Sequence, residues 1–521
     1  MRKIAYFILS FLLLAQLSHS QGEVEALKYS RNELFGTARA MAMGNAFGAL
    51  GGDVTGVAIN PAGIGVYRSS EIVGTLGYMQ NNSKAGDVKS NVGEFNLHNF
   101  GFVGYFPLRN ESMPMINFGF THNRQKTFKR DISAGGFGQS TLIDYIADRS
   151  YGINPDLLKM GKDLPDPFLD QPWLSVLGYN SWLIYPHEGG DKGYYYTPLD
   201  TKGEEAYQQI RSYERGYIDH YDFTIGTTVN NVLNLGLSIN IVDIYHNLSS
   251  DFLEDFDNGR YTLENDIRTN GAGVGAKFGL IYRPVNAFRI GLAYHTPMRY
   301  SMTELYYATI DDDLGKYVTD SNYEKGRTSS AKFPNYYDLQ TPDKWVMSAA
   351  AVLGNNFIVS ADYELTDYGK MKLKVPSGNS NKGWYDIDNE YIRSDFKMAS
   401  NLRLGMEYRF TPQLSGRLGY SWMESPYKAD FGGDAAISRS NTIFRVEGDT
   451  NYYTGGFGFR FSREFYADFA LVYQVQNDQL YPFPNLYQYN GSDRGDLVID
   501  AAPFDLKVSS LRGLLTFGYR F

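Results

Sequence analysis

From residue 71 to the carboxy terminus, apolar and polar residues alternate in runs of about ten, the length of a membrane-crossing strand. The clearest runs are residues 401–410, 413–423 and 464–476. In residues 401–410, one face holds Leu, Met, Tyr and Phe, whereas the other holds Arg, Gly and Glu. Successive side chains of a strand point to opposite faces, so the alternation predicts strands with one face toward lipid and one toward water.

Together these runs predict an all-β protein, a transmembrane antiparallel β-barrel of about 14 strands. Single-chain bacterial barrels have an even number of strands, which this number satisfies. The strands are expected at residues 71–80, 96–106, 115–123, 219–229, 232–246, 270–283, 287–305, 342–353, 356–372, 395–410, 413–424, 448–461, 464–478 and 508–521.

The connections between these strands alternate between short and long from the second strand onward. The short ones are residues 107–114, 230–231, 284–286, 354–355, 411–412 and 463. The long ones are residues 124–218, 247–269, 306–341, 373–394, 425–447 and 479–507. Outer-membrane barrels have tight periplasmic turns and long outer loops, whereas a soluble β-sandwich has no reason for this alternation. The pattern therefore favours a barrel.

The last predicted strand ends the chain on Phe521. Its outward face is apolar and carries Leu511, Gly513, Leu515, Phe517 and Tyr519. In a soluble protein so apolar an edge would promote aggregation. An aromatic carboxy-terminal strand resembles the signal that the outer-membrane assembly machinery reads. We therefore expect that machinery and outer-membrane lipid as partners.

Residues 35–67 do not share the alternation, because they are rich in Gly, Ala and Met and nearly free of charge. The stretch ends in the turn Asn60, Pro61, Ala62 and Gly63. Small side chains let backbone pass close to other backbone, and glycine permits bends that larger residues do not. We therefore predict that residues 21–67 form a hatch in the lumen of a barrel formed by residues 68–521.

Residues 1–20 have a basic start, an apolar run and small residues at the end, which predicts a secretory signal peptide cleaved before Gln21. The run is short of the ~20 residues that a membrane-spanning helix needs. Without Arg2 and Lys3 the formal net charge of −9 becomes −11, which argues against nucleic acid as a partner.

Composition narrows the chemistry further. Aromatic residues make up 15% of the chain, and there is no Cys, which excludes disulfides, thiolate catalysis and cysteine metal sites. The motifs HExxH, GxSxG and GxxxxGK[ST] are absent, and the histidines are scattered without metal spacing. We expect no enzyme activity, no catalytic residue, no metal and no cofactor.

The longest connection contains an apolar stretch, residues 167–185, where polar loop sequence would be expected. Its apolar residues are Trp173, Leu174, Val176, Leu177, Trp182, Leu183 and Ile184. They either form the private core of a folded loop or line an exposed groove that captures a hydrophobic ligand. The two readings are compatible.

Several charged residues fall on the predicted lumen face of the strands. They are Arg289, Arg403, Arg409, Arg417, Arg460, Arg512, Arg520, Asp362, Glu364, Glu407 and Asp468. The simpler interpretation is that they pair with one another in a water-filled interior. The alternative is that Arg289, Arg403 or Arg417, near the hatch, contacts the carboxylate of a fatty acid.

The sequence INPAGIGVY at the end of the hatch, with the barrel pattern behind it, resembles the FadL/TodX family of outer-membrane channels. Further matching stretches are residues 278–298, 341–368 and 401–422. The resemblance implies a fourteen-stranded barrel closed by an amino-terminal hatch, which passes long-chain fatty acids or aromatic hydrocarbons. The connection at 124–218 has no matching counterpart, so the family's ligand contacts cannot be transferred there.

The leading hypothesis is therefore a monomeric channel in the outer membrane of a Gram-negative-type bacterium. It would take up hydrophobic small molecules, such as long-chain fatty acids, by passive diffusion gated by the hatch. The alternatives are a haemin-binding receptor and a barrel that only displays loops for surface binding or adhesion. A barrel lipase or acyltransferase is a more distant third.

Overall fold

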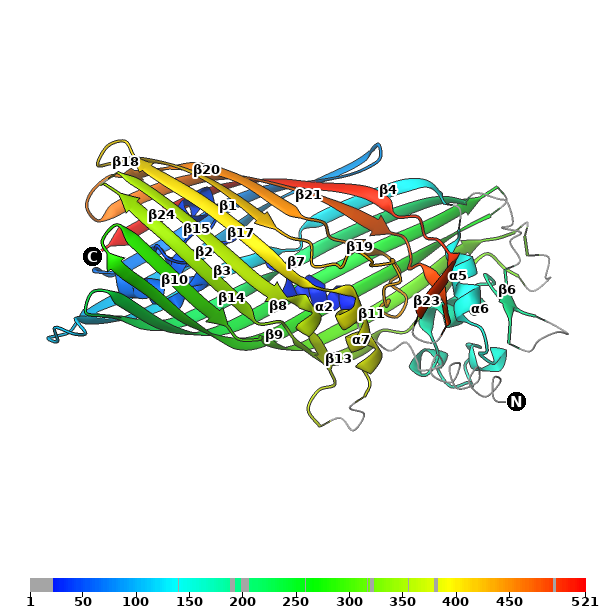
Figure 1. Ribbon diagram of the computed structural model, residues 1–521. Coiled ribbons are helices and arrows are strands. Elements are labelled where there is room, and N and C mark those ends of the chain that lie inside the picture. The colour runs from blue at the N-terminus through cyan, green and yellow to red at the C-terminus, as the bar shows by residue number, and fades with distance from the viewer. Residues whose placement is uncertain are drawn as a thin grey trace.

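The computed structural model describes residues 22–521 except 139, 188–192, 198–205, 258, 316, 319–322, 355, 379–382 and 491–492. The predicted signal peptide lies outside the described residues. A 14-strand antiparallel barrel forms the wall (Figure 1). It closes because β24 (Phe504–Arg520) pairs with β21 (Phe465–Tyr481) on one side and β1 (Glu71–Ala85) on the other.

The strands of the wall follow one another in chain order, and three of them are interrupted, each by a short break between two segments. The interrupted strands are β3 (Met115–Thr127) with β4 (Arg130–Gly138), β10 (Phe288–His295) with β11 (Arg299–Asp313), and β13 (Phe333–Gln340) with β14 (Lys344–Leu353). The others are β2 (Val88–Pro107), β7 (Ala206–Val229), β8 (Leu233–Phe256), β9 (Gly259–Val285), β15 (Phe357–Asp367), β17 (Met398–Arg409), β18 (Leu414–Met423) and β20 (Thr450–Arg460).

Each predicted strand corresponds to a strand of the wall, but several extend further toward the long loops. β7 begins at Ala206 rather than at 219, and β9 begins at Gly259 rather than at 270. The predicted 124–218 loop is shorter for the same reason, because β4 continues to Gly138. These extensions lack a lipid-facing apolar row, so the alternation that predicts strands does not mark them.

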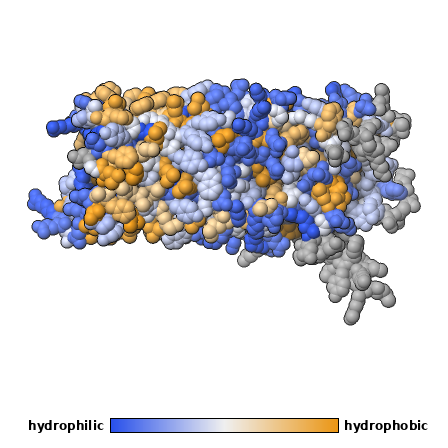
Figure 2. All heavy atoms as spheres, turned by 45° about the horizontal axis from the view of Figure 1, so that its top comes forward, coloured by the Kyte–Doolittle hydropathy of each residue, from blue (hydrophilic) through white to orange (hydrophobic). Residues whose placement is uncertain are grey.

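The alternation along each strand matches the two faces of the wall. On β24, Leu511, Phe517 and Tyr519 are exposed, whereas Arg512 and Thr516 are buried. Figure 2 shows the apolar outer surface concentrated toward the end that carries the short turns, with a polar surface toward the loop end. In the short turn between β7 and β8, Asn230 and Asn231 have φ values of 50° and 58°, the left-handed backbone that a type I′ turn requires at both central residues.

The amino-terminal segment lies inside the barrel as short helices with almost no exposed residue. These are α2 (Glu23–Ser30), α3 (Ala38–Ala42), α4 (Val54–Ile59) and the 3-10 helix η1 (Pro61–Val66). Three side chains accept hydrogen bonds from the first turns: Thr37 caps α3, Asp53 caps α4 and Asn60 caps η1. The helices are therefore set by local sequence and enclosed by the wall.

The long loops pack over the other end of the barrel (Figure 1). Their elements are α5 (Leu142–Arg149), η2 (Pro155–Leu157), η3 (Pro167–Leu169), α6 (Trp173–Asn180), β5 (Tyr185–Pro186), β6 (Tyr195–Tyr196), β12 (Gly326–Ser329), η4 (Tyr368–Lys370), β16 (Lys372–Lys374), α7 (Asp386–Asp395), β19 (Phe444–Val446), β22 (Leu486–Asn490) and β23 (Asp493–Ile499). Within the described part of the chain, no helix is both long and apolar enough to cross a membrane.

Candidate functional site

The hatch turn is fixed to its surroundings by Asn60, which is fully buried. Its side-chain amide donates to the carbonyl oxygens of Gly48 (2.8 Å) and Leu280 (3.2 Å), and its Oδ1 accepts from the backbone N–H of Ala62 (3.1 Å). The Leu280 carbonyl belongs to β9 of the wall. One side chain therefore joins two hatch segments and the barrel.

Two wall glycines let the turn approach the wall. A Cβ on Gly236 would lie 2.2 Å from the Pro61 carbonyl carbon, and a Cβ on Gly279 would lie 2.1 Å from the Oδ1 of Asn60. No larger residue fits at either position without displacing the hatch. Gly236 of β8 and Gly279 of β9 thus let the hatch backbone pack against the wall.

Three cationic or polar wall side chains donate to carbonyl oxygens of the hatch. Lys277 Nζ reaches the Ala58 oxygen at 2.8 Å, and His295 Nε2 reaches the Ile59 oxygen at 2.8 Å. Both carbonyls belong to the last turn of α4, where helix carbonyls lack partners within the helix. The third donor, Arg289, bonds the Leu50 oxygen.

A carboxylate from the wall caps the middle of the hatch. Asp362 accepts hydrogen bonds from the backbone N–H groups of Phe47 (3.0 Å) and Gly48 (2.9 Å). Hydrogen bonds from a backbone donor to a carboxylate are among the stronger kinds in proteins. Asp362 therefore holds the loop between α3 and α4 against β15.

A chain of four charges ties α3 to the wall. Arg39 binds Glu407 in a bidentate pair (2.9 and 3.2 Å), and Glu407 also accepts from Arg417 Nε at 2.6 Å. Arg417 in turn binds Asp468 at 2.5 Å. Burial alone would lower the pKa of the Arg39 guanidinium, but the Glu407 carboxylate raises it above its ordinary value. The hatch is thus anchored by an ion pair to one side of the lumen.

The hatch segments also hold one another. Thr37 donates to both oxygens of Asp53 (3.0 and 2.9 Å), and its own N–H donates to Thr55 Oγ1 (2.8 Å). Asn45 donates to the Phe35 carbonyl (2.7 Å). Residues 35–55 are therefore one hydrogen-bonded unit, so displacement of α4 acts on the segment around Phe35.

A cavity of about 60 Å³ lies in the lumen directly against the hatch. The hatch contributes Ser30, Asn32, Glu33, Leu34, Phe35, Ala58 and Ile59 to its lining. The wall contributes apolar Met298, Tyr300, Pro342, Tyr368 and Met423, and polar Gln125, His220, Lys277, His295, Thr296, Thr341, Lys344, Glu364, Asn401 and Arg403.

Cations outnumber carboxylates in this cavity and its immediate contacts. Lys277 pairs with Asp222 (3.3 Å), whereas Lys344 (3.7 Å) and Arg403 share Glu364. Glu33 also lines the cavity and pairs with Arg512, so four cations and three carboxylates leave one positive charge. Because the groups are buried, that charge favours an anionic ligand more strongly than a surface lysine would.

His220 faces the same cavity and is buried, with 5% of its surface exposed. Among the residues that the structure describes, neither of its ring nitrogens has a hydrogen-bond partner. Buried polar side chains are normally hydrogen-bonded, and exceptions tend to have a functional reason. His220 therefore offers a free donor or acceptor to whatever occupies the cavity.

The structure separates the three arginines that the sequence singles out. Arg403 lines the cavity, so a contact with a ligand carboxylate stays a prediction for it. Arg289 is engaged with the Leu50 carbonyl of the hatch, and Arg417 is held between Glu407 and Asp468. These two side chains anchor the hatch or its network. Sequence reasoning missed Lys277, Lys344 and His220.

Two further inward-facing predictions differ from the structure. Arg409 and Arg460 are exposed rather than enclosed by the lumen. Both are the last residues of their strands, at the end with the short turns. At the end of a strand the lumen opens to water, so a side chain that points to the lumen face is exposed there even though the alternation along the strand places it inside.

The apolar loop residues are in the core of the loop rather than on its surface. Trp173, Leu174, Val176, Leu177, Leu183 and Ile184 are at most 4% exposed, and Trp182 packs beside them. An exposed groove formed by these side chains is therefore not present. The apolar residues that this loop exposes are Leu157, Met160, Leu164 and Leu169.

β2 and β3 lose their backbone pairing above Asn99 and Asn123. Side-chain hydrogen bonds bridge the separation there: Asn81 donates to the Lys129 carbonyl, Ser83 to the Asp131 carbonyl and Thr127 to Glu94, each at 2.6 Å. In the described chain, residues 88–97 of β2 pair only with β1, while β3 and β4 continue along β7. A second, much smaller cavity of about 10 Å³ lies at this separation. Glu33 and Gln125 line both cavities, so they form the partition between them.

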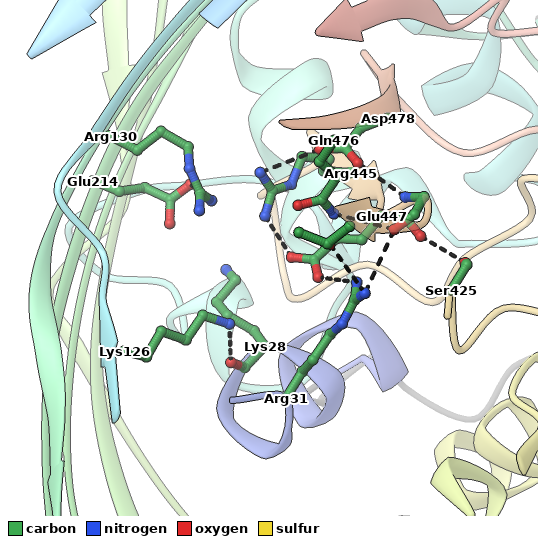
Figure 3. A network of polar contacts seen from close by, with 12 residues as sticks. Lys28, Arg31, Lys126, Arg130, Glu214, Ser425, Arg445, Glu447, Gln476 and Asp478 are labelled. Carbon is green, nitrogen blue, oxygen red and sulfur yellow. Dashed lines mark hydrogen bonds and ion pairs between the residues drawn. The ribbon is translucent and has the colours of Figure 1, made fainter. Parts of the chain in front are cut away.

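The helix α2 is held toward the loop end by a separate ionic network (Figure 3). Arg31 binds Glu447 at 2.7 Å, and Arg445 binds the other oxygen of the same carboxylate. Lys126 donates to the Lys28 carbonyl (2.8 Å). Burial alone would raise the pKa of Glu447, but the Arg445 and Arg31 guanidinium groups hold it well below its usual range.

A closed barrel with a plug in its lumen and a cavity against that plug defines a plugged outer-membrane channel. The chain belongs to the outer membrane transport protein family OMPP1/FadL/TodX, whose sequence model matches residues 219–492. It is therefore an outer-membrane transport protein of a family of channels for hydrophobic compounds. No curated protein matches the sequence.

Among the solved structures, the fold is supported by a FadL homologue. A Pseudomonas aeruginosa FadL homologue is 12% identical, with 94% of this chain and 99% of that chain covered and a TM-score of 0.51. The Ralstonia pickettii toluene transporter TbuX is 15% identical, with 94% and 98% covered and a TM-score of 0.49. At such identities the likeness shows the fold alone.

The described residues contain no group of three or more His, Cys, Asp or Glu side chains arranged to hold a metal ion.

Proposed function

We propose that the protein takes up hydrophobic small molecules bearing a carboxylate, such as long-chain fatty acids, by passive diffusion gated by the hatch. The observation that carries this proposal is the cavity against the hatch. Part of its lining is apolar and suits a hydrocarbon chain that enters as the hatch shifts, and its surplus cation suits one carboxylate. An uncharged aromatic hydrocarbon would leave that buried charge unneutralised.

The cationic groups converge on one part of the cavity. Lys344 of β14 and Arg403 of β17 flank Glu364 on the intervening strand β15, and His220 supplies an unsatisfied ring. In this proposal the carboxylate lies among these groups while the chain lies along Met298, Tyr300 and Met423. Charge-assisted hydrogen bonds then fix the head and apolar contact fixes the tail.

The lapse of backbone pairing between β2 and β3 supports sideways release into the membrane, once the side-chain bonds that bridge it separate. Open sheet edges do not occur in the hydrocarbon region unless they border a cavity, which is the situation of β2 here. The partition at Glu33 and Gln125 is closed by the Glu33 N–H to Gln125 oxygen bond (3.1 Å) and by the Glu33–Arg512 ion pair. Displacement of the hatch would open it.

The test is uptake of labelled oleate by cells that display equal amounts of wild-type protein and of Asn60→Ala with Pro61→Ala. Loss of the Asn60 cap and its bonds costs about 1–2 kcal/mol, which loosens the hatch but leaves the wall intact. We expect altered oleate flux with a folded, heat-modifiable barrel. Equal oleate uptake by the wild-type protein and the double variant would refute hatch gating. Oleate uptake that is the same in cells with and without the barrel would leave only a binding or adhesion role.

His220 favours one second candidate, haemin binding, because an unpartnered buried imidazole is available as an axial ligand. A Soret shift on adding haemin that disappears in His220→Gln, without oleate binding, would establish that function. Oleate binding with no such shift supports the fatty-acid proposal.

A further inference from the structure

The donors that hold the end of α4 are the donors that face the ligand cavity. Lys277 lines the cavity, yet its Nζ donates to the Ala58 carbonyl at 2.8 Å and lies 3.3 Å from Asp222. Ala58 also lines the cavity, so the Lys277 to Ala58 hydrogen bond forms part of the cavity surface. A bound carboxylate would meet this bond directly.

We infer that Lys277 couples ligand binding to hatch release, because a carboxylate in the cavity competes with the Ala58 carbonyl for the same ammonium group. This inference rests on the proposed function, since it names the regulation of that transport site. A carboxylate accepts a stronger hydrogen bond from an ammonium group than a neutral carbonyl does. Binding of the ligand therefore weakens one hatch contact as it forms.

The released contact lies where the hatch can transmit the change. Ala58 belongs to α4, whose first turn is capped by Asp53, and Asp53 is bonded to Thr37. Thr37 follows the segment of Glu33 and Phe35, which partitions the two cavities. Movement of α4 is therefore transmitted to the partition at Glu33 through the hydrogen bond between Asp53 and Thr37.

His295 is the secondary donor in this arrangement. It also lines the cavity and donates to the neighbouring Ile59 carbonyl at 2.8 Å. The last two carbonyls of α4 are therefore both held by cavity-facing side chains. A ligand that engages either side chain frees an end of the helix that has no intrahelical partner.

The chain supplies a matched control. Arg289 also donates to a hatch carbonyl, that of Leu50, but it does not line the cavity. Removing Arg289 therefore weakens the hatch without removing a donor that a ligand can reach. Comparison of Lys277→Gln with Arg289→Gln separates coupling from simple loosening.

The experiment uses a thiol reporter on the hatch of the purified full-length protein. The chain has no Cys, so Val57→Cys, at a fully buried hatch position, gives a single labelling site. The rate of maleimide labelling is measured with dodecanoate, with its methyl ester and without ligand. We expect dodecanoate to raise the rate of maleimide labelling of the wild-type protein roughly tenfold, the change in population that corresponds to the free energy of one hydrogen bond to a charged group. We expect the methyl ester to leave the rate unchanged.

In Lys277→Gln we expect a raised basal rate and no response to dodecanoate, and in Arg289→Gln a raised basal rate with the response retained. A full response in Lys277→Gln, or an equal response to the ester, would overturn the inference. Because Lys277→Gln leaves Asp222 buried without its cation, Lys277→Gln with Asp222→Asn serves if the single variant misfolds. Labelling is measured without transport, so it succeeds or fails independently of oleate uptake.

Discussion

Replacing Arg39 by Met removes the ion pair between α3 and the wall while leaving the rest of the charge network intact. Glu407 loses the bidentate contacts at 2.9 and 3.2 Å but keeps Arg417 at 2.6 Å, so no carboxylate is left buried without a partner. The cost is therefore about 1.5–3 kcal/mol, the value of hydrogen bonds to charged groups, rather than the 3–5 kcal/mol of an orphaned charge.

That loss falls on the docked hatch, because Glu407, Arg417 and Asp468 all belong to the wall. At 1.4 kcal/mol for each factor of ten, we expect the population of displaced hatch to rise roughly 10- to 150-fold. The assay is maleimide labelling of Val57→Cys in the Arg39→Met background, with heat-modifiable migration as the check on barrel folding. Arg39→Lys keeps the charge without the bidentate fork, and we expect an intermediate rate.

The reasoning also predicts a larger effect for Glu407→Gln. That substitution leaves Arg39 without its partner and Arg417 with only Asp468. Labelling of a folded Arg39→Met variant at the wild-type rate would refute the assignment of this pair as a hatch anchor.

Three further outcomes follow from the structure. Burial raises the pKa of the Asp395 carboxyl in α7 to about 6 from 3.8, so the folded loop retains a proton that the unfolded loop loses. The stability of the loop therefore falls as pH rises from about 3.8 to about 6. Hydrogen exchange of α7, corrected for the intrinsic rate, should show this loss of stability, and Asp395→Asn should abolish it. Trp173→Ala should cost the loop about 3–5 kcal/mol and expose it to protease while the barrel stays resistant, because that ring is 2% exposed in the loop core. Deletion of residues 511–521 removes the strand that closes the wall, so the product should show no heat-modifiable barrel in membranes.

The wall could be predicted from the sequence because lipid imposes alternation on each strand. The outward row of Leu511, Phe517 and Tyr519 on β24 shows this. The breaks at 296–298 and 341–343 and the strand extensions above the apolar band could not be predicted in this way, since no lipid-facing row accompanies them there. The predicted number of strands and the alternation of short and long connections still agree with the structure, because both depend only on the part of each strand that crosses the membrane.

The site was less predictable because alternation gives the face of a residue but not its neighbours. Lys277 has an exposed neighbour in Phe278, and Lys344 has one in Trp345, so both could be assigned to the lumen from parity. Which inward residues share one height depends on strand register, which the sequence pattern leaves open. For the apolar stretch in the longest loop, the sequence could not decide between a buried loop core and an exposed groove, because both require the same residue types.

Hatch gating is tested most directly by locking the hatch to the wall. A Cβ on Gly48 would lie 3.1 Å from the Ser348 Cβ of β14, which is close enough for a disulfide after a small shift, and the chain has no other cysteine. Uptake of labelled oleate is measured in cells displaying Gly48→Cys with Ser348→Cys, oxidised and then reduced. The account predicts that oxidation lowers uptake to that of cells without the barrel and that reduction restores it. Equal uptake by the oxidised and reduced forms would contradict it.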